Sequence, residues 1–251
     1  MSSIKQLQGK VCVITGSSRG IGKAIVERFA QEGAIVYANS LETDPIEDWV
    51  YDLALKNHTT VIPLYFDITD SLAAKDALLK VKKDQGKIDV LVNNAGLGYN
   101  ELIGMISIDK MREIFEVNVF ALTNMLQLTA RIMIKQQSGS IINISSTVGM
   151  KGNPGQLAYS ASKGAVISIT KSAAKELAPN KIRVNSIAPG LVDTEMFRMA
   201  ESKNMEERIS RIGMGRLAKP VEIATACVFL ASDNSEYLSG QIIAVDGCAL
   251  I

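Results

Sequence analysis

Val-Cys-Val-Ile-Thr at residues 11–15 runs directly into Gly-Ser-Ser-Arg-Gly-Ile-Gly at residues 16–22, and a helix-like stretch follows. A buried strand that ends in a glycine-rich turn before a helix is typical of phosphate-binding α/β folds. Glycine lets the backbone approach a pyrophosphate without a Cβ clash, and the helix N-terminus favours negative charge. We therefore predict that Gly16, Gly20 and Gly22 hold a dinucleotide, although glycines also serve in tight packing at such corners.

The same rhythm of strand and helix continues along the chain. Runs rich in Val and Ile predict seven strands, at 11–15, 35–39, 61–66, 90–93, 140–145, 183–187 and 241–245. Helical patterns fill the gaps, at 20–32, 45–57, 70–85, 107–136, 156–178 and 220–232. The strand runs are nearly continuous in apolar residues rather than alternating, which indicates strands covered on both faces. We predict a single Rossmann-type domain over residues 1–251, α/β and doubly wound, with a parallel seven-stranded sheet.

The segment 192–214 departs from that rhythm. It is Met-rich and amphipathic, and Gly213 and Gly215 stand at its end. We predict that it forms a lid over the substrate.

Composition excludes several classes of protein. The 27 Lys and Arg residues nearly balance the 26 Asp and Glu residues, so a net charge of +1 gives no global field for nucleic acid or anionic lipid. The amino-terminal residues lack the apolar region of a signal peptide, and the chain has no uncharged apolar run of 18 residues. Three scattered cysteines and one histidine argue against a disulfide framework or a metal site. We expect a cytoplasmic protein that binds neither nucleic acid nor membrane.

Small and polar residues gather where the predicted strands end. Ligands of open parallel sheets bind beyond the carboxyl ends of the strands. Four of those ends carry such sequences, at 15–22, 93–96, 145–146 and 189–190. The sequence therefore predicts one binding cleft at this edge of the sheet.

The end of the second strand bears on the choice of nicotinamide cofactor. An acidic residue there would accept the ribose hydroxyls of NAD and repel the 2′-phosphate of NADP. The segment Tyr-Ala-Asn-Ser at 37–40 has no carboxylate before Glu42. Arg19 can pair with a 2′-phosphate, and Asn39 and Ser40 can donate hydrogen bonds to it, so we predict NADP(H). The alternative is that Arg19 merely faces solvent.

Tyr159 and Lys163 share one face of a predicted helix, because they are four residues apart. A nearby ammonium favours the phenolate, so Lys163 is expected to lower the pKa of Tyr159 for acid/base catalysis. Ser145 ends the preceding strand and can stabilise charge on a substrate oxygen. By themselves, Tyr159 and Lys163 could be an ordinary pair on a helix face, and Ser145 could be a helix or turn cap. The prediction of a catalytic site therefore depends on the surrounding motifs.

These segments, in this order, resemble the short-chain dehydrogenase/reductase family. The matching motifs are Thr-Gly-Ser-Ser-Arg-Gly-Ile-Gly at 15–22, Asn-Asn-Ala-Gly at 93–96, Ser145, Tyr-Ser-Ala-Ser-Lys at 159–163 and Pro-Gly at 189–190. The resemblance implies that Asn118 is a fourth catalytic residue, which holds a water linked to the lysine. It also implies that Asp67 contacts the adenine, Lys163 the nicotinamide ribose and Thr194 the carboxamide side of the cofactor.

Within the family, residues 215–220 and the chain onward to Asp246 and Gly247 most resemble 3-oxoacyl-[acyl-carrier-protein] reductases, as does the segment 100–105. The resemblance implies an acyl carrier protein as partner and a homotetramer formed through the helices at 107–136 and 156–178 and the last strand. Lys135 and Lys175 fit a carrier site, but Gln-Gln-Ser at 136–138 departs from its basic pattern.

The predicted function is NADPH-dependent reduction of a 3-oxoacyl thioester, with Tyr159 as general acid. A dehydrogenase for a free ketone, alcohol or sugar and a non-catalytic Rossmann binding protein are the alternatives. The predicted catalytic residues are Asn118, Ser145, Tyr159 and Lys163. The predicted cofactor contacts are Gly16, Ser18, Arg19, Gly20, Ile21, Gly22, Asn39, Ser40, Asp67, Ile68, Asn94, Ala95, Gly96, Tyr159, Lys163, Pro189, Gly190, Val192 and Thr194.

Overall fold

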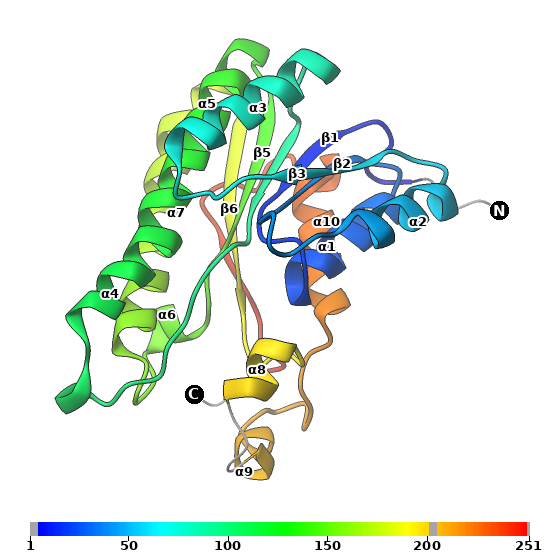
Figure 1. The fold of residues 1–251 in the computed structure, drawn as a ribbon. Helices are drawn as coiled ribbons and strands as arrows, with labels where there is room; N and C mark the ends of the chain where they lie inside the picture. Colours follow the sequence, from blue (N-terminus) through cyan, green and yellow to red (C-terminus); the bar gives the residue numbers. More distant parts are fainter. Residues whose placement is uncertain (1–4, 201–204, 250–251) are drawn as a thin grey trace.

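A computed structural model describes residues 5–200 and 205–249 of the chain (Figure 1). One parallel sheet runs through it, with the strand order β3-β2-β1-β4-β5-β6-β7. Its strands are β1 (Val11–Ile14), β2 (Ile35–Ser40), β3 (Val61–Tyr65), β4 (Val90–Asn93), β5 (Gly139–Ile144), β6 (Ile182–Pro189) and β7 (Ile242–Val245). The order reverses at β1, between β2 and β4. The predicted doubly wound parallel sheet is confirmed, and its switch point lies where the glycine-rich turn leaves β1.

Helices cover both faces of the sheet (Figure 1). One face carries α1 (Gly20–Gln31), α2 (Glu47–Asn57) and α10 (Pro220–Ala231), and the other carries α3 (Ser71–Gln85), α5 (Leu122–Gln136) and α7 (Leu157–Leu177). Each layer has its own apolar core, one around Phe29 and the other around Met125 and Met133. Both faces being buried explains why the strands are continuously apolar.

Short elements lie in the connections. They are η1 (Ile103–Met105), α4 (Ile108–Phe115), η2 (Glu116–Ala121), α6 (Val148–Lys151), η3 (Ala178–Asn180), α8 (Glu195–Ala200), α9 (Met205–Ser210) and η4 (Asp233–Ser235). The predicted lid contains α8 and α9, whereas its residues 201–204 lie outside the described part of the chain.

The predicted helix at 107–136 is in fact three consecutive pieces. A turn of π-helix, η2, separates α4 from α5. The sequence does not reveal this turn, because the apolar pattern continues through it. A π-helical turn adds only one residue to the helical repeat. The whole run, Ile108–Gln136, is long and apolar enough to cross a membrane, but half of its most apolar window is buried inside the protein.

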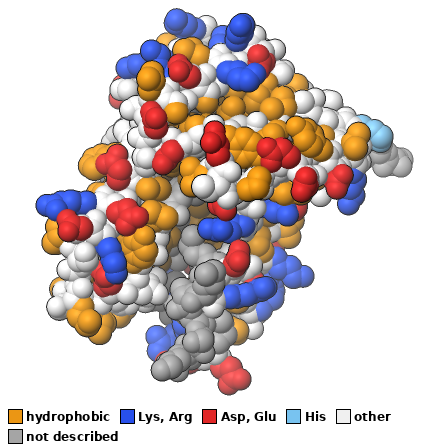
Figure 2. All heavy atoms as spheres, in the orientation of Figure 1, with side chains coloured by type: hydrophobic (Ala, Val, Ile, Leu, Met, Phe, Trp, Pro, Cys, Tyr) orange, Lys and Arg blue, Asp and Glu red, His pale blue; other side chains and the backbone are white. Residues whose placement is uncertain are grey.

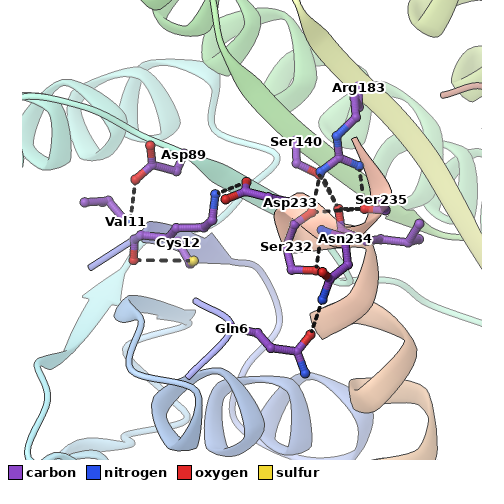
Figure 3. Close-up of polar contacts among 12 residues, drawn as sticks. Gln6, Val11, Cys12, Asp89, Ser140, Arg183, Ser232, Asp233, Asn234 and Ser235 are labelled. Carbon is purple, nitrogen blue, oxygen red and sulfur yellow. Dashed lines mark hydrogen bonds and ion pairs between the residues drawn. The ribbon is translucent and has the colours of Figure 1, made fainter. Parts of the chain in front are cut away.

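The amino edge of the sheet is closed by polar contacts (Figure 3). Asp89 accepts a hydrogen bond from the backbone N–H of Val11 at 2.7 Å, and Asp233 pairs with Lys10 at 2.7 Å. Arg183 of β6 donates to the Leu230 carbonyl at 2.8 Å, where α10 ends. These contacts join the starts of the strands to the last turn of α10.

Candidate active site

A large cleft of about 1510 Å³ opens at the carboxyl edge of the sheet. It receives residues from the ends of β1, β2, β4, β5 and β6 and from the predicted lid. All of the predicted site residues line it except Asn118. The fold therefore brings together at one edge residues that are as much as 178 positions apart, from Gly16 to Thr194.

The glycine loop closes tightly on itself. Gly16 and Gly20 have positive φ angles of 65° and 57°, which glycine adopts without steric cost. A Cβ on Gly22 would lie 2.0 Å from the Gly16 carbonyl oxygen, so this position admits no side chain. The loop can thus present its backbone to the cleft, as a phosphate site requires.

The first turn of α1 is open to an anion. Its N-cap residue is Arg19, and within the described residues no side chain caps its N–H groups. The helix α3 differs, because the Asp70 carboxylate accepts from the N–H groups of Leu72 and Ala73. Uncapped N–H groups and the helix dipole favour a bound phosphate. The loop and helix start therefore fit the pyrophosphate of a nicotinamide dinucleotide.

Asn94 fixes the neighbouring strand end against this loop. Its side-chain amide donates to the carbonyls of Thr15 at 3.0 Å and Gly16 at 2.9 Å. The Thr15 hydroxyl in turn accepts from the backbone N–H groups of Asn94 and Ala95. These hydrogen bonds hold β4 and the glycine loop together at the floor of the cleft.

The Ser145 hydroxyl is hydrogen-bonded to residues of β6. It donates to the Ile187 carbonyl at 3.1 Å and accepts from the Ser186 hydroxyl at 2.7 Å, so it is engaged between β5 and β6. The neighbouring Ser146, which also lines the cleft, is the serine that makes a side-chain hydrogen bond with Tyr159. The structure thus corrects the prediction for Ser145 and identifies Ser146, which the sequence analysis missed.

Tyr159 and Lys163 lie on one face of α7, as predicted. The Lys163 ammonium is 5.7 Å from the centre of the Tyr159 ring and donates to the Ile144 carbonyl at 2.9 Å. Burial lowers the pKa of Lys163 to about 8. Burial also raises the pKa of the Tyr159 hydroxyl, and this outweighs the opposing hydrogen bond with Ser146. The expectation that Lys163 lowers the pKa of Tyr159 is therefore wrong for this structure, in which desolvation of the phenol dominates.

Asn118 sits in the π-helical turn η2 and is completely buried. Its amide donates to the Leu97 carbonyl at 2.8 Å and the Ser162 hydroxyl at 3.0 Å, and its oxygen accepts from the Leu97 N–H at 2.8 Å. A Cβ placed on Gly96 would lie 3.0 Å from the Asn118 oxygen and 3.3 Å from the Lys163 ammonium. Asn118 is thus next to Lys163, behind the wall of the cleft. A π-helical turn of this kind is frequent at functional sites.

Asn39 and Ser40 donate their side-chain hydrogen bonds to backbone carbonyls of the protein, contrary to the prediction. The Asn39 amide donates to the carbonyls of Leu64 at 3.2 Å and Phe66 at 2.9 Å, and its oxygen accepts from the Gly16 N–H at 3.3 Å. The Ser40 hydroxyl donates to the Asp44 carbonyl at 2.7 Å. Because both side chains are buried and already hydrogen-bonded, they are not available as the predicted donors to a 2′-phosphate.

The structure brings an unpredicted carboxylate to this end of the cleft. Asp44 lines it, and its carboxylate oxygen lies 3.9 Å from the Arg19 guanidinium. The alternative that Arg19 merely faces solvent holds in part, because 62% of its side chain is exposed. The Asp-Pro pair at 44–45 was the available signal, since it predicts a turn that could return towards the loop.

The remaining predicted contacts complete the rim. Asp67 is exposed and holds its own turn by accepting from the N–H and hydroxyl of Thr69, both at 2.8 Å. A Cβ on Gly190 would lie 2.8 Å from Asp246 Cα, so this turn after β6 packs directly on the chain beyond β7. Thr194 lies close to the glycine loop, 3.5 Å from where a Cβ of Gly20 would be.

Ala249 joins the predicted lid to α6 at the side of the cleft. Ile212 pairs with Ala249 as an isolated antiparallel bridge, and the Lys151 ammonium of α6 donates to the Ala249 carbonyl at 3.1 Å. All three residues line the cleft. Ala249 therefore connects the end of the predicted lid with the helix that follows Ser146.

Comparison with known proteins agrees with this geometry. Residues 16–248 match the family model described as enoyl-(acyl carrier protein) reductase. The chain is similar to a 3-oxoacyl-[acyl-carrier-protein] reductase of Thermotoga maritima, at 44% identity over 98% of this chain and 100% of the relative. It is 36% identical to the enzyme of that name from Chlamydia muridarum, over 96% and 97% of the two chains. A 3alpha-hydroxysteroid dehydrogenase of Mediterraneibacter gnavus is also 36% identical, over 97% and 98%.

These matches extend over nearly the whole chain and include the glycine loop and the segment with Tyr159 and Lys163. They indicate an oxidoreductase that acts on carbonyl or hydroxyl groups with a nicotinamide cofactor. The chain belongs to the short-chain dehydrogenase/reductase family.

Proposed function

We propose that this protein reduces a 3-oxoacyl thioester to the 3-hydroxyacyl thioester with NADPH, and that Tyr159 is the general acid. The observation that carries the proposal is the buried Tyr159 hydroxyl, which is hydrogen-bonded to Ser146 in the cleft onto which the glycine loop opens. We further propose that residues 1–251 act as one catalytic domain, with 192–214 as the substrate lid.

NADPH would supply the hydride when bound. Its pyrophosphate would lie at the glycine loop, residues 16–22, and the first turn of α1, and Arg19 is the cationic residue of that loop for the 2′-phosphate. Its adenine would lie near Asp67 and Ile68, and its nicotinamide near Pro189–Gly190, Val192 and Thr194. All of these residues line the cleft.

Tyr159 is proposed to transfer its proton to the substrate carbonyl oxygen as negative charge develops there. Its raised pKa keeps the hydroxyl protonated at neutral pH, which suits a general acid. Ser146 hydrogen-bonds to Tyr159, and we propose that its hydroxyl turns to donate its hydrogen to the same substrate oxygen when substrate is bound. Lys163, with a pKa of about 8, is well placed to exchange a proton near neutral pH, and Asn118 is proposed to position the water beside it.

The relatives support the thioester as substrate, because several are named 3-oxoacyl-[acyl-carrier-protein] reductases. An acyl carrier protein as partner and a role in fatty acid biosynthesis follow from those names as proposals. The dehydrogenase of Mediterraneibacter gnavus favours a second candidate, reduction of a free ketone such as a 3-oxosteroid. Gln136 weakens the carrier interpretation, since its amide forms two hydrogen bonds with the Ile88 backbone in place of presenting a positive charge.

We also propose a cytoplasmic homotetramer. Two exposed apolar residues, Phe120 in η2 and Ile134 near the end of α5, suit burial against a second copy. Sedimentation equilibrium would test the tetramer, and a monomer at working concentration would contradict it.

A single assay tests the reaction. The oxidation of NADPH is followed by its absorbance with acetoacetyl thioesters, both of coenzyme A and of an acyl carrier protein, and with a panel of free ketones that includes a 3-oxosteroid. Turnover with the thioesters supports the proposal. Turnover confined to free ketones would contradict the thioester and favour the second candidate.

A further inference from the structure

We propose that Asp44 sets the balance between NADPH and NADH by competing with the 2′-phosphate of NADPH for Arg19. This inference rests on the proposed function, in which the adenosine end of the cofactor lies beside these two residues. Asp44 lies four positions beyond the end of β2, whereas the sequence pattern predicts that the residue selecting the cofactor lies at the strand end itself.

The turn after β2 holds Asp44 in place. Its N–H donates to the Leu41 carbonyl at 3.0 Å, and its own carbonyl accepts from the Ser40 hydroxyl at 2.7 Å. The carboxylate lies 3.9 Å from the Arg19 guanidinium, and both side chains line the cleft. The backbone of Asp44 is therefore held near Arg19 by contacts that do not depend on the ion pair.

Other side chains at this corner are committed elsewhere. The amide of Asn39 donates to the carbonyls of Leu64 and Phe66 at the end of β3, and the hydroxyl of Ser40 donates within the turn. Among the described residues of the glycine loop and of the segment after β2, the charged residues that line the cleft are Arg19 and Asp44. The electrostatics at the 2′ position of the ribose are therefore decided mainly between these two residues.

The two residues act in opposite directions on the two cofactors. A guanidinium attracts the phosphate of NADPH, while a carboxylate repels it and occupies the guanidinium that would bind it. A carboxylate also accepts a hydrogen bond from the 2′-hydroxyl of NADH. The ion pair is long, and the two side chains are 62% and 42% exposed, so a phosphate can displace Asp44 from Arg19. The protein should therefore bind NADPH more weakly than Arg19 alone would allow.

The test is a titration of the cofactor-free protein with NADPH and with NADH, followed by the fluorescence of the cofactor. Asp44→Asn should tighten NADPH binding by roughly fivefold, near the upper end for an exposed charge pair, and should leave NADH unchanged or weaker. The gain should shrink as salt is added, because the charges are exposed to solvent.

Glu42→Gln is the matched control. It removes the same charge two residues away, from a side chain that is exposed and is not among the described lining residues. An equal gain in NADPH affinity in both variants would overturn the proposal, because it would show a general effect of net charge. A second arm uses Arg19→Gln, in which Asp44→Asn should give a smaller gain, because only the direct repulsion between carboxylate and phosphate is then removed. A full gain in that background would also overturn competition for Arg19.

The same titration separates this inference from the proposed function. A parent protein that binds NADH but not NADPH contradicts the NADPH-dependent reaction itself. A parent protein that binds NADPH, with the ratio of the two affinities unchanged by Asp44→Asn, contradicts the role of Asp44 alone.

Discussion

The polar side chains at the two edges of the sheet have different surroundings. At the amino edge, polar side chains are paired inside the protein, as with Arg183, which donates to Leu230, Ser232 and Ser235 (Figure 3). At the carboxyl edge, polar groups line a cleft of about 1510 Å³. The same strands thus contribute hydrogen bonds for stability at one end and chemical groups for function at the other, as expected for a doubly wound sheet.

Charged side chains of both signs are mixed over the surface. In the space-filling view, Lys and Arg side chains alternate with Asp and Glu over the visible face, without a large area of one sign (Figure 2). This mixture agrees with the net charge of +1. An anionic cofactor is therefore attracted by local groups such as Arg19 and the start of α1 rather than by the field of the whole protein. Changes at either edge can test this division of roles.

Tyr159→Phe should have the largest effect on turnover. Phenylalanine keeps the ring and removes the acidic hydroxyl, so kcat should fall by roughly 10³-fold, within the range of a general acid. Binding of NADPH should change by less than about twofold, because the ring stays in place. Steady-state kinetics and a fluorescence titration measure the two quantities.

Tyr37→Phe is the control for that change. Tyr37 is completely buried, and its hydroxyl accepts from the Gln85 amide at 3.0 Å, outside the described lining of the cleft. Its loss should leave kcat unchanged. Turnover by Tyr159→Phe within tenfold of the parent would contradict the assignment of the general acid.

The adjacent serines provide the next largest contrast. Ser146→Ala should lower kcat by roughly 10²-fold, the effect of losing one donor to a developing oxyanion. Ser145→Ala should leave kcat within about threefold and lower stability by about 1 kcal/mol, the cost of one buried hydrogen bond. The measurements are steady-state kinetics and urea unfolding. The reverse ranking of the two kcat values would restore Ser145 as the catalytic serine.

The choice between these serines shows where sequence reasoning ends. Consecutive side chains of a strand point to opposite faces of the sheet. Which of two adjacent polar residues faces the site is therefore known only once the face of each residue is known. Ser145 still belongs to the ladder, since its N–H donates to the Ile187 carbonyl at 2.8 Å. Ser146 alternates with Ser145, and the next bond to β6 is from the Thr147 N–H to the Pro189 carbonyl at 3.1 Å. The sequence predicted the strand end, and the pairing with β6 decided which hydroxyl reaches Tyr159.

Other parts of the site were predictable to different degrees. The glycine loop and the pair of Tyr159 and Lys163 follow from local spacing, and the structure places them at one cleft as expected. Asp44 was missed because its approach to Arg19 depends on a turn fixed by contacts with Ser40 and Leu41. The pKa of Tyr159 was predicted in the wrong direction, because burial depends on the tertiary structure.

Gly22→Ala should act on the cofactor rather than on the proton transfer. The new Cβ would lie 2.0 Å from the Gly16 oxygen and 2.6 Å from the Asn94 amide, so the loop must open. We expect NADPH binding to weaken by roughly tenfold or more, since the backbone donors of the loop are displaced. Gly104→Ala is the control, because a Cβ there meets nothing within 4 Å. Unchanged binding in Gly22→Ala would contradict the phosphate site.

Arg183→Met at the amino edge should have the smallest effect on turnover. The arginine is half-buried, and its loss removes the hydrogen bonds that its guanidinium donates to the carbonyls of Leu230 and Ser232. We expect a loss of roughly 2 kcal/mol in the free energy of unfolding, measured with urea, because hydrogen bonds from a charged donor contribute more than neutral ones. The kcat of the folded protein should stay within about twofold, because the substitution lies at the opposite edge from the cleft. Lys80→Met, which removes an exposed ion pair with Asp84 on α3, should alter neither quantity measurably. A fall in kcat at unchanged stability would show that the two edges are coupled and that the division between them does not hold.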